Sequence, residues 1–283
     1  MMQRTIRNTV DTRGVGIHSG NSVTLTLAPA GSDEGVGFIR EDLNARLRVP
    51  AHFSRVRNTQ LATTLTDDGV SIATVEHLTA SLLALGVDNV TIALSGPEVP
   101  ILDGSAEPFV SLIRSAGISE GSAPRKGARI VGPITVTSGD CRAELRPGPD
   151  HLHLDYTIVY ENPHIGTQRF SFDLTADAFA REVAPARTFG LFNDINGMYA
   201  QGLALGGSLE NAVVIGDDGV MNPEGLRFDD ECVRHKCLDA IGDLSLFGMP
   251  ILGDFIAYKS GHRLNHLLVQ ELFRQQAYEI IPL

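Results

Sequence analysis

His235, Asp239 and Asp243 follow one another at intervals of four residues in the segment 228–244. Residues at this interval lie on one face of a helix, so an imidazole and a carboxylate could both reach one metal ion. Such a pair is more often a surface ion pair or a hydrogen-bonded pair, and two ligands do not hold a catalytic metal. The metal-binding interpretation therefore needs a third ligand from elsewhere in the chain.

A second candidate helix begins at Thr74-Val75-Glu76-His77-Leu78, with Thr74 as its expected N-cap. We choose His77 as the third ligand, because two histidines and one aspartate leave one position of a tetrahedral zinc ion open for water. Glu76 beside it could accept a proton from that water. Taken singly, His77 is more often an ordinary partly buried histidine, and Glu76 more often a first-turn residue favoured by the helix dipole.

The segment 228–244 has the pattern of an amphipathic helix. Its acidic residues 229–231 stand in the expected first turn, where the helix dipole favours negative charge. Apolar residues recur at helical spacing and form one side, which consists of Val233, Cys237, Ala240, Ile241 and Leu244. The helix would therefore hold the histidine and the two aspartates in a fixed relation to one another.

Composition limits the classes of function. The chain has 283 residues, of which 43% are hydrophobic and 20% charged, as in an ordinary soluble globular protein. Its net charge of -11 argues against binding to nucleic acid or to anionic membranes, although a local basic site for a phosphate is compatible with it. The odd number of cysteines, three, is typical of reduced thiols in a cytosol-like compartment. Neither a secretory signal nor an apolar run of about 18 residues is recognised. We expect a cytoplasmic protein without an integral membrane segment.

The order of the predicted elements is the same in both halves of the chain: several strands, a helix that carries a histidine, a strand and a closing helix. We predict an α+β fold with two domains of similar topology, residues 1–120 and 128–283, joined by the small polar stretch 118–128. The helices would lie sandwiched between two β-sheets. A site between the two helix layers would take ligands from both halves.

The individual elements follow from alternation, helical spacing and turn residues. Strands are predicted at 5–10, 22–27, 38–49, 60–65, 88–94, 130–137, 141–146, 151–160, 167–173, 211–215 and 254–258. Helices are predicted at 74–85, 106–116, 176–183, the start of 192–207, 228–244 and a last segment that ends near Ala277. The loop 14–20 lacks the third glycine of a dinucleotide-binding loop and no helix follows it, so a Rossmann fold is rejected. His18 at its tip is a weak site candidate.

Six short segments resemble, in the same order and spacing, those of UDP-3-O-acyl-N-acetylglucosamine deacetylase, the zinc enzyme of lipid A synthesis in Gram-negative bacteria. They are Gly14-Val15-Gly16-Ile17-His18-Ser19-Gly20, Thr74-Val75-Glu76-His77-Leu78, Ile101-Leu102-Asp103-Gly104-Ser105, Ala186-Arg187-Thr188-Phe189-Gly190, His235-Lys236-Cys237-Leu238-Asp239 with Asp243, and Ser260-Gly261-His262-Arg263-Leu264-Asn265. The resemblance runs from about residue 3 to about residue 275. It implies a fold of two similar domains with four helices between two sheets, in agreement with the element order.

The resemblance also implies the chemistry of the site. His77, His235 and Asp239 would bind Zn²⁺ and leave a position for water. Glu76 would take the proton of this water as it attacks the acetamide carbonyl, and His262 would act as a cation or general acid. The implied activity is the hydrolysis of UDP-3-O-acyl-N-acetylglucosamine to UDP-3-O-acyl-glucosamine and acetate, the committed step of lipid A biosynthesis.

Further roles are implied for the residues around this centre. Asp243 would orient His262 and stabilise its charge, and Thr188 would donate a hydrogen bond to the tetrahedral intermediate. On the substrate side, the resemblance implies roles for four residues: Lys236 near the diphosphate, Tyr160 near the uracil, His18, and Phe189 at the start of an apolar passage for the acyl chain. This passage is an insert at about residues 189–215.

Two other functions remain open from the residues alone. One is a zinc hydrolase that acts on another amide or acyl substrate. The apolar insert and Lys236 argue against it, because they favour a nucleotide that carries an acyl chain as the substrate. The other is a nucleotide- or lipid-binding protein without catalysis, against which the intact set of acid, base and ligand residues argues. We expect a monomer whose partner is a small UDP-sugar with an acyl chain, and no nucleic acid.

Overall fold

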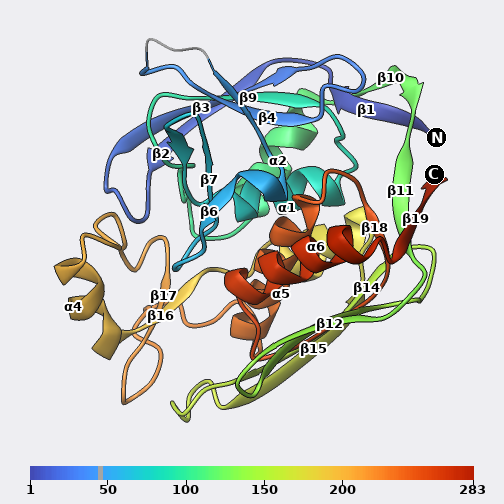
Figure 1. Cartoon of the computed structure of the whole chain (residues 1–283). Helices are drawn as coiled ribbons and strands as arrows, with labels where there is room; N and C mark the ends of the chain where they lie inside the picture. The colour runs from blue at the N-terminus through green and yellow to red at the C-terminus, as the bar shows by residue number, and fades with distance from the viewer. Residues whose placement is uncertain (44–46) are drawn as a thin grey trace.

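The computed structural model describes residues 1–43 and 47–283 and shows helices lying between two β-sheets (Figure 1). The two helices at its centre are α1 (Glu76–Ala84) and α5 (Glu231–Ser245), which pack against each other. Both are buried over most of their length, as expected for helices covered by a sheet on each side. The α+β class predicted from the sequence is confirmed.

The first half of the chain forms the upper sheet in Figure 1. Its order is β2 (Val10–Val15), β3 (Ser22–Pro29), β9 (Val90–Leu94), β4 (Val36–Arg40) and β5 (Arg48–Pro50). In β3 the alternating residues Val23, Leu25 and Leu27 are fully buried, which gives the sheet one apolar face. A smaller sheet consists of β6 (Val56–Asn58), β7 (Thr64–Asp67) and β8 (Val70–Ile72), and follows a 3₁₀ turn, η1 (Phe53–Arg55).

The second half forms the lower sheet. Its strands are β11 (Lys126–Ile130), β12 (Ile134–Ser138), β13 (Cys141–Arg146), β14 (Leu152–Val159), β15 (Thr167–Asp173), β18 (Ile251–Tyr258) and β19 (Tyr278–Pro282). Strand β18 is central, because it pairs with β11, β13 and β14. Buried residues alternate along β14, so its apolar face points toward the helices.

Four further helical segments complete the fold. Helix α2 (Glu107–Ala116) packs against α1, and α6 (His262–Gln275) packs against α5. Helix α3 (Ala176–Ala178) continues as a π-helical turn, η2 (Phe179–Val183). Helix α4 (Phe192–Ala200) lies to the side of the layers (Figure 1). In the chain it follows β16 (Phe189–Leu191) and precedes β17 (Val213–Ile215), and these two strands pair in parallel. Within the described residues, no helix is long and apolar enough to cross a membrane.

The polar stretch 118–128 is not an irregular linker. Most of it is β10 (Ile118–Pro124), which pairs with β1 (Met2–Ile6), and β11 begins immediately after Arg125. Small and polar side chains are compatible with a two-stranded sheet of this kind, which buries little apolar surface. We propose that the boundary between the two predicted domains lies at Arg125, where the chain passes from strands of the first half to the lower sheet.

Several predicted element boundaries are wrong. The strand predicted at 5–10 is divided between β1 and β2, and the one predicted at 130–137 is divided between β11 and β12. Pro133 lies in the second break, where it can donate no ladder hydrogen bond. Strand β19 was not predicted. The strand predicted at 38–49 is divided between β4 and β5, with residues 41–43 in a turn, and residues 44–46 lie outside the described residues.

Two helix starts also differ from the prediction. Helix α5 begins at Glu231, so Asp229 and Asp230 precede it rather than fill its first turn. Helix α1 begins after Val75, and Thr74 is not its N-cap. Thr74 has a φ of 58° and its hydroxyl donates to Glu98 Oε1 across 2.9 Å, so this contact replaces the expected cap.

Candidate metal centre and active site

The close contact of α1 with α5 brings the first group of polar residues together. A Cβ atom on Gly242 of α5 would lie 2.2 Å from the carbonyl oxygen of Glu76 on α1, so only glycine allows the two backbones this approach. The hydroxyl of Thr79 donates to the Gly242 carbonyl across 3.2 Å. This contact places the start of α1, with Glu76 and His77, beside the middle of α5.

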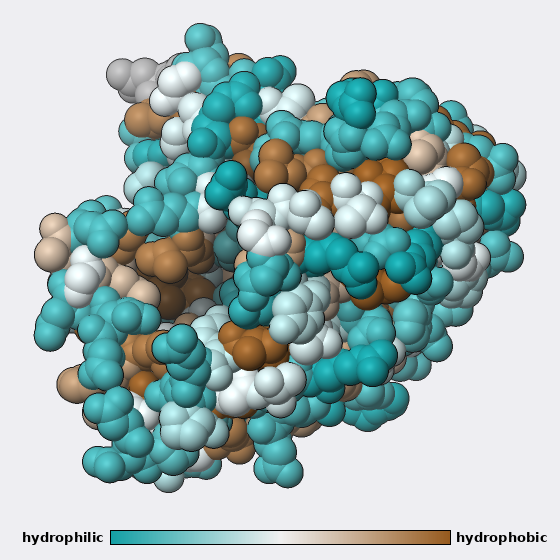
Figure 2. All heavy atoms as spheres, turned by 60° about the horizontal axis from the view of Figure 1, so that its bottom comes forward, coloured by the Kyte–Doolittle hydropathy of each residue, from teal (hydrophilic) through white to brown (hydrophobic). Residues whose placement is uncertain are grey.

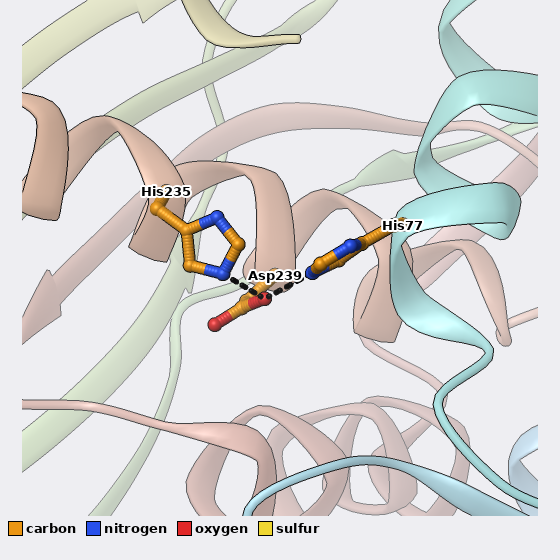
Figure 3. Close-up of side chains that lie close together, drawn as sticks. All are labelled: His77, His235 and Asp239. Carbon is orange, nitrogen blue, oxygen red and sulfur yellow. Dashed lines mark ion pairs between the residues drawn. The ribbon is translucent and has the colours of Figure 1, made fainter. Parts of the chain in front are cut away.

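The three predicted metal ligands converge at this contact (Figure 3). Asp239 Oδ1 lies 3.6 Å from His77 Nε2 and 3.4 Å from His235 Nε2. All three side chains are buried, and their ligand atoms lie within 4.8 Å of one another. Donors bound to one tetrahedral ion at about 2.0–2.2 Å would be separated by roughly 3.3–3.6 Å, close to the distances observed here.

The protonation states of His235 and Asp239 also fit a metal ion. Burial lowers the pKa of His235 to about 3 despite the nearby Asp239 carboxylate, so its imidazole is neutral. His235 Nδ1 donates to the Ala186 carbonyl across 3.1 Å, which leaves the lone pair on Nε2. Burial would raise the pKa of Asp239, but Lys236 and the histidines outweigh it and hold that pKa well below its ordinary value. A neutral imidazole from His235 and a carboxylate from Asp239 are thus available, beside His77, to bind a metal ion.

Glu76 lies beside this group and is buried, with 3% of its surface exposed. Its Oε2 accepts a hydrogen bond from the Thr63 amide across 3.1 Å, and its Oε1 lies 3.9 Å from His262 Nε2. Burial raises the pKa of Glu76, and the neighbouring histidines only partly oppose this effect. A carboxylate with a raised pKa is suited to accept and return a proton near neutral pH.

His262 begins helix α6 and faces the same centre. Its Nδ1 lies 2.9 Å from Asp243 Oδ2, and its Nε2 lies 3.8 Å from Asp239 Oδ2. Burial alone would lower the pKa of His262, but the carboxylates of Asp243, Asp239 and Glu76 together raise it to about 10. The imidazole is therefore a cation at neutral pH, with Nε2 available as a proton donor on the side of the metal centre.

A cavity of about 520 Å³ opens onto these residues. It is lined by every predicted site residue other than Asp243: His18, Glu76, His77, Tyr160, Thr188, Phe189, His235, Lys236, Asp239 and His262. Asp243 stands behind His262 instead. Apolar residues of the insert, including Leu191 and Met198, form another part of the wall, and Figure 2 shows a hollow with hydrophobic residues on the side where the insert lies. The cavity thus joins a charged centre to an apolar wall.

Lys236, Phe189 and Tyr160 form one side of the cavity. The Tyr160 and Phe189 rings meet edge to face, with their centroids 5.6 Å apart. Lys236 Nζ lies 5.7 Å from the centroid of the Phe189 ring and 2.8 Å from Asp239 Oδ2. The lysine therefore stabilises the charge of a predicted metal ligand, a contact that the i, i+3 spacing allows but the sequence analysis did not anticipate.

Sequence reasoning missed three residues that hold the site in place. Thr63 and Asn265 both donate to Asp243, across 2.6 and 2.9 Å, and so fix the carboxylate that binds His262. The buried Glu98 accepts hydrogen bonds from the amides of His18 and Ser19, and thereby positions the glycine-rich loop. Asn265 belongs to the segment 260–265 that the sequence analysis had noted, whereas Thr63 and Glu98 lie outside every such segment.

Comparison with known proteins identifies the family. Residues 3–274 match the family described as LpxC, UDP-3-O-acyl N-acetylglycosamine deacetylase. A protein from Myxococcus xanthus (strain DK1622), named UDP-3-O-acyl-N-acetylglucosamine deacetylase, is 50% identical over 281 residues, which are 99% of this chain and 89% of the relative. Relatives of the same name from Histophilus somni (strain 129Pt) and Shewanella halifaxensis (strain HAW-EB4) are 49% and 47% identical, over 99% of this chain and 92% and 93% of their own. The chain therefore belongs to the UDP-3-O-acyl N-acetylglycosamine deacetylase family, and it is a hydrolase.

Proposed function

We propose that this protein hydrolyses the acetamide of UDP-3-O-acyl-N-acetylglucosamine, with Zn²⁺ as its cofactor, to give UDP-3-O-acyl-glucosamine and acetate. The observation that carries the proposal is the convergence of two buried histidines and Asp239 with Glu76 and His262 on the wall of a partly apolar cavity. The identity of 47–50% to relatives that bear the deacetylase name supports the choice of substrate.

His77, His235 and Asp239 would hold the ion, and Zn²⁺ bound there would polarise the acetamide carbonyl and make water acidic. Glu76 accepts a proton from the attacking water, because its carboxylate faces the centre and burial raises its pKa toward neutrality. The Thr63 amide holds Glu76 Oε2, so the other oxygen, Oε1, remains directed toward the reacting atoms.

His262 supplies the second proton. Its imidazolium, stabilised by Asp243, places Nε2 on the side of the metal centre, from which it donates a proton to the nitrogen of the departing sugar amine. Thr188 also lines the cavity. Its hydroxyl would donate to the oxyanion that develops on the acetamide oxygen. Attack by water and loss of the amine then yield acetate and the free amino sugar.

The rest of the cavity would bind the remainder of the substrate. Lys236 contributes positive charge on the diphosphate side, Tyr160 stacks on the uracil, and His18 contacts the sugar from the glycine-rich loop. The insert that begins at Phe189 would receive the acyl chain, because Leu191 and Met198 give it an apolar inner wall. We further propose that the protein is monomeric and cytoplasmic, in keeping with its three free cysteines.

The experiment that tests this proposal is incubation of the purified protein with UDP-3-O-acyl-N-acetylglucosamine, followed by measurement of acetate and of the product mass. We expect one acetate for each molecule of UDP-3-O-acyl-glucosamine. Release of the fatty acid instead, or turnover only of a different amide, would show that the site has another substrate. UDP-N-acetylglucosamine without the acyl chain is the matched control and should be a poor substrate.

A further inference from the structure

A buried ion pair joins the start of α5 to the segment that leads into the insert. Glu231 is 1% exposed and Arg187 is 2% exposed. Glu231 Oε1 accepts hydrogen bonds from both the amide and Nε of Arg187, each across 2.9 Å, and its Oε2 accepts from the Arg187 guanidinium across 3.2 Å. Glu231 Oε2 also accepts from the Arg227 amide across 2.6 Å, so both carboxylate oxygens are fully used.

The arginine of this pair is equally constrained. Its guanidinium donates to Glu224 Oε1 across 2.5 Å and to the Gly225 carbonyl across 2.7 Å. These bonds fix the backbone of Arg187 against the first turn of α5. Neither Arg187 nor Glu231 belongs to the cavity wall, so neither contacts the substrate directly.

The two neighbours of Arg187 are functional. The carbonyl of Ala186 accepts the hydrogen bond of His235 Nδ1, and it belongs to the same planar peptide group as the anchored amide of Arg187. His235 follows Glu231 by four residues on α5, so the same three-residue segment is attached to α5 at two points one helical turn apart. On the other side, Thr188 lines the cavity onto which the metal centre opens.

We propose that Arg187 and Glu231 are positioning residues for the metal centre: their ion pair holds the Ala186 carbonyl that orients His235 and the backbone that places Thr188. The inference rests on the proposed function, because it assigns a purpose to the pair only if His235 binds a metal ion and Thr188 contacts the substrate. The carbonyl partner of a ligand histidine fixes its tautomer and ring orientation, and loss of such a partner commonly weakens metal affinity about 10–100-fold.

The geometry favours this role over one in stability alone. A buried ion pair often adds little to stability over apolar residues of the same size, because both charges lose their hydration. Here the pair fixes a backbone amide as well as two side chains, and that amide belongs to the same peptide group as the Ala186 carbonyl that accepts from His235. A hydrophobic replacement could fill the space of this pair but could not hold the amide.

Two variants test the proposal. Glu231→Gln keeps the size of the side chain but presents an NH₂ group to the Arg227 amide and the Arg187 guanidinium, which are themselves donors. Arg187→Lys keeps the charge but loses the forked contacts to Glu231, Glu224 and Gly225. It is the milder change and decides the question if Glu231→Gln does not fold.

Arg40→Lys is the matched control. Arg40 is 8% exposed and pairs with Asp42 through two hydrogen bonds of 2.7 and 2.6 Å, with a third to the Ser71 carbonyl across 2.9 Å. The pair lies at the end of β4 and outside the cavity wall. Its loss should therefore lower thermal stability without a change at the metal centre.

Zn²⁺ affinity is measured on the full chain by competition with a chromogenic chelator, with kcat and the thermal midpoint measured on the same samples. We expect Glu231→Gln and Arg187→Lys to bind Zn²⁺ about tenfold more weakly and to lose kcat, while Arg40→Lys keeps the wild-type affinity. Wild-type affinity in both test variants, with stability lowered as in the control, would overturn the positioning role. A wild-type protein that binds no Zn²⁺ would overturn the proposed function itself.

Discussion

Asp243 of α5 and His262 of α6 form a buried pair, with Oδ2 and Nδ1 separated by 2.9 Å. The Asp243 carboxylate also accepts hydrogen bonds from Thr63 and Asn265, so its position does not depend on the histidine. Because Nδ1 is engaged, Nε2 is the nitrogen that faces Glu76 and Asp239. The pair thus joins the last two helices into one catalytic unit and determines both the charge and the direction of the imidazole.

Asp243→Asn should move the basic limb of the pH–rate profile to lower pH. The His262 imidazole carries its charge below its pKa, which the carboxylates raise to about 10 against the effect of burial. A cationic general acid is therefore present at neutral pH and is lost as the pH rises through that value. Removal of the Asp243 charge lowers the pKa of His262, so we expect kcat to fall at a pH about 1–3 units lower than in the wild type.

The matched control for this change is Asp173→Asn. Asp173 contacts His151 and His153 across 2.8 and 2.7 Å at the exposed surface of the lower sheet, and none of the three belongs to the cavity wall. It should leave the pH–rate profile unchanged. A basic limb that stays in place in Asp243→Asn would show that His262 is not the group that titrates there.

Glu76→Gln should separate metal binding from catalysis. The amide can still accept the hydrogen bond from Thr63 but cannot accept a proton from water, so we expect kcat to fall about 10²–10⁴-fold. Metal content measured by atomic emission should remain that of the wild type, because Glu76 is not one of the three converging ligands. Near-normal kcat in this variant would eliminate Glu76 as the base.

Met198→Glu should reduce activity toward long acyl chains. Met198 of α4 lines the cavity, and a charge on this wall would meet the apolar chain. We expect KM for a long-chain substrate to rise roughly tenfold, which corresponds to the loss of a few buried methylene contacts. For a short-chain substrate we expect kcat to stay unchanged. Tyr199→Asn, at an exposed neighbour outside the cavity wall, is the control. Equal effects on both chain lengths would refute an acyl-binding role for α4.

Gly242→Ala should disturb the site by separating two helices. The added Cβ would lie 2.2 Å from the Glu76 carbonyl oxygen, so α1 must move away from α5. Such overpacking costs about 1–3 kcal/mol of stability and would move His77 away from His235 and Asp239. Gly197→Ala in α4 meets no atom within 4 Å and should be neutral or stabilising. Denaturant unfolding and metal content test both variants, and an unaffected Gly242→Ala protein would contradict the close contact.

The sequence predicted much of the local structure because periodic patterns specify it. Helix α5 follows the apolar spacing that was identified, and the i, i+4 interval placed His235 and Asp239 on one face. The choice of His77 as a third ligand needed a different kind of argument, from the donor set and from resemblance. The structure brings it to the other two, from a helix that lies more than a hundred residues away in the chain.

Other features could not be predicted because they depend on contacts between distant segments. Thr63 positions Asp243 through a hydrogen bond, and Glu98 positions the glycine-rich loop in the same way. These contacts arise only when the chain folds, so the residue types alone do not reveal them. Strands β10 and β19 have no clear alternation, since each lies at an edge and buries little. The close approach at Gly242 is likewise invisible in the sequence, where a glycine within a helix predicts only lower helical stability.

The central claim is that His77, His235 and Asp239 hold one catalytic Zn²⁺. The measurement that tests it most directly is zinc stoichiometry together with acetate release, for the wild type and for Asp239→Ala, before and after dialysis against a chelator. We predict one zinc per wild-type chain, loss of turnover on chelation and recovery when Zn²⁺ is added back, with Asp239→Ala retaining little metal. Turnover that survives complete removal of the metal, or stoichiometric zinc in Asp239→Ala, would contradict the account.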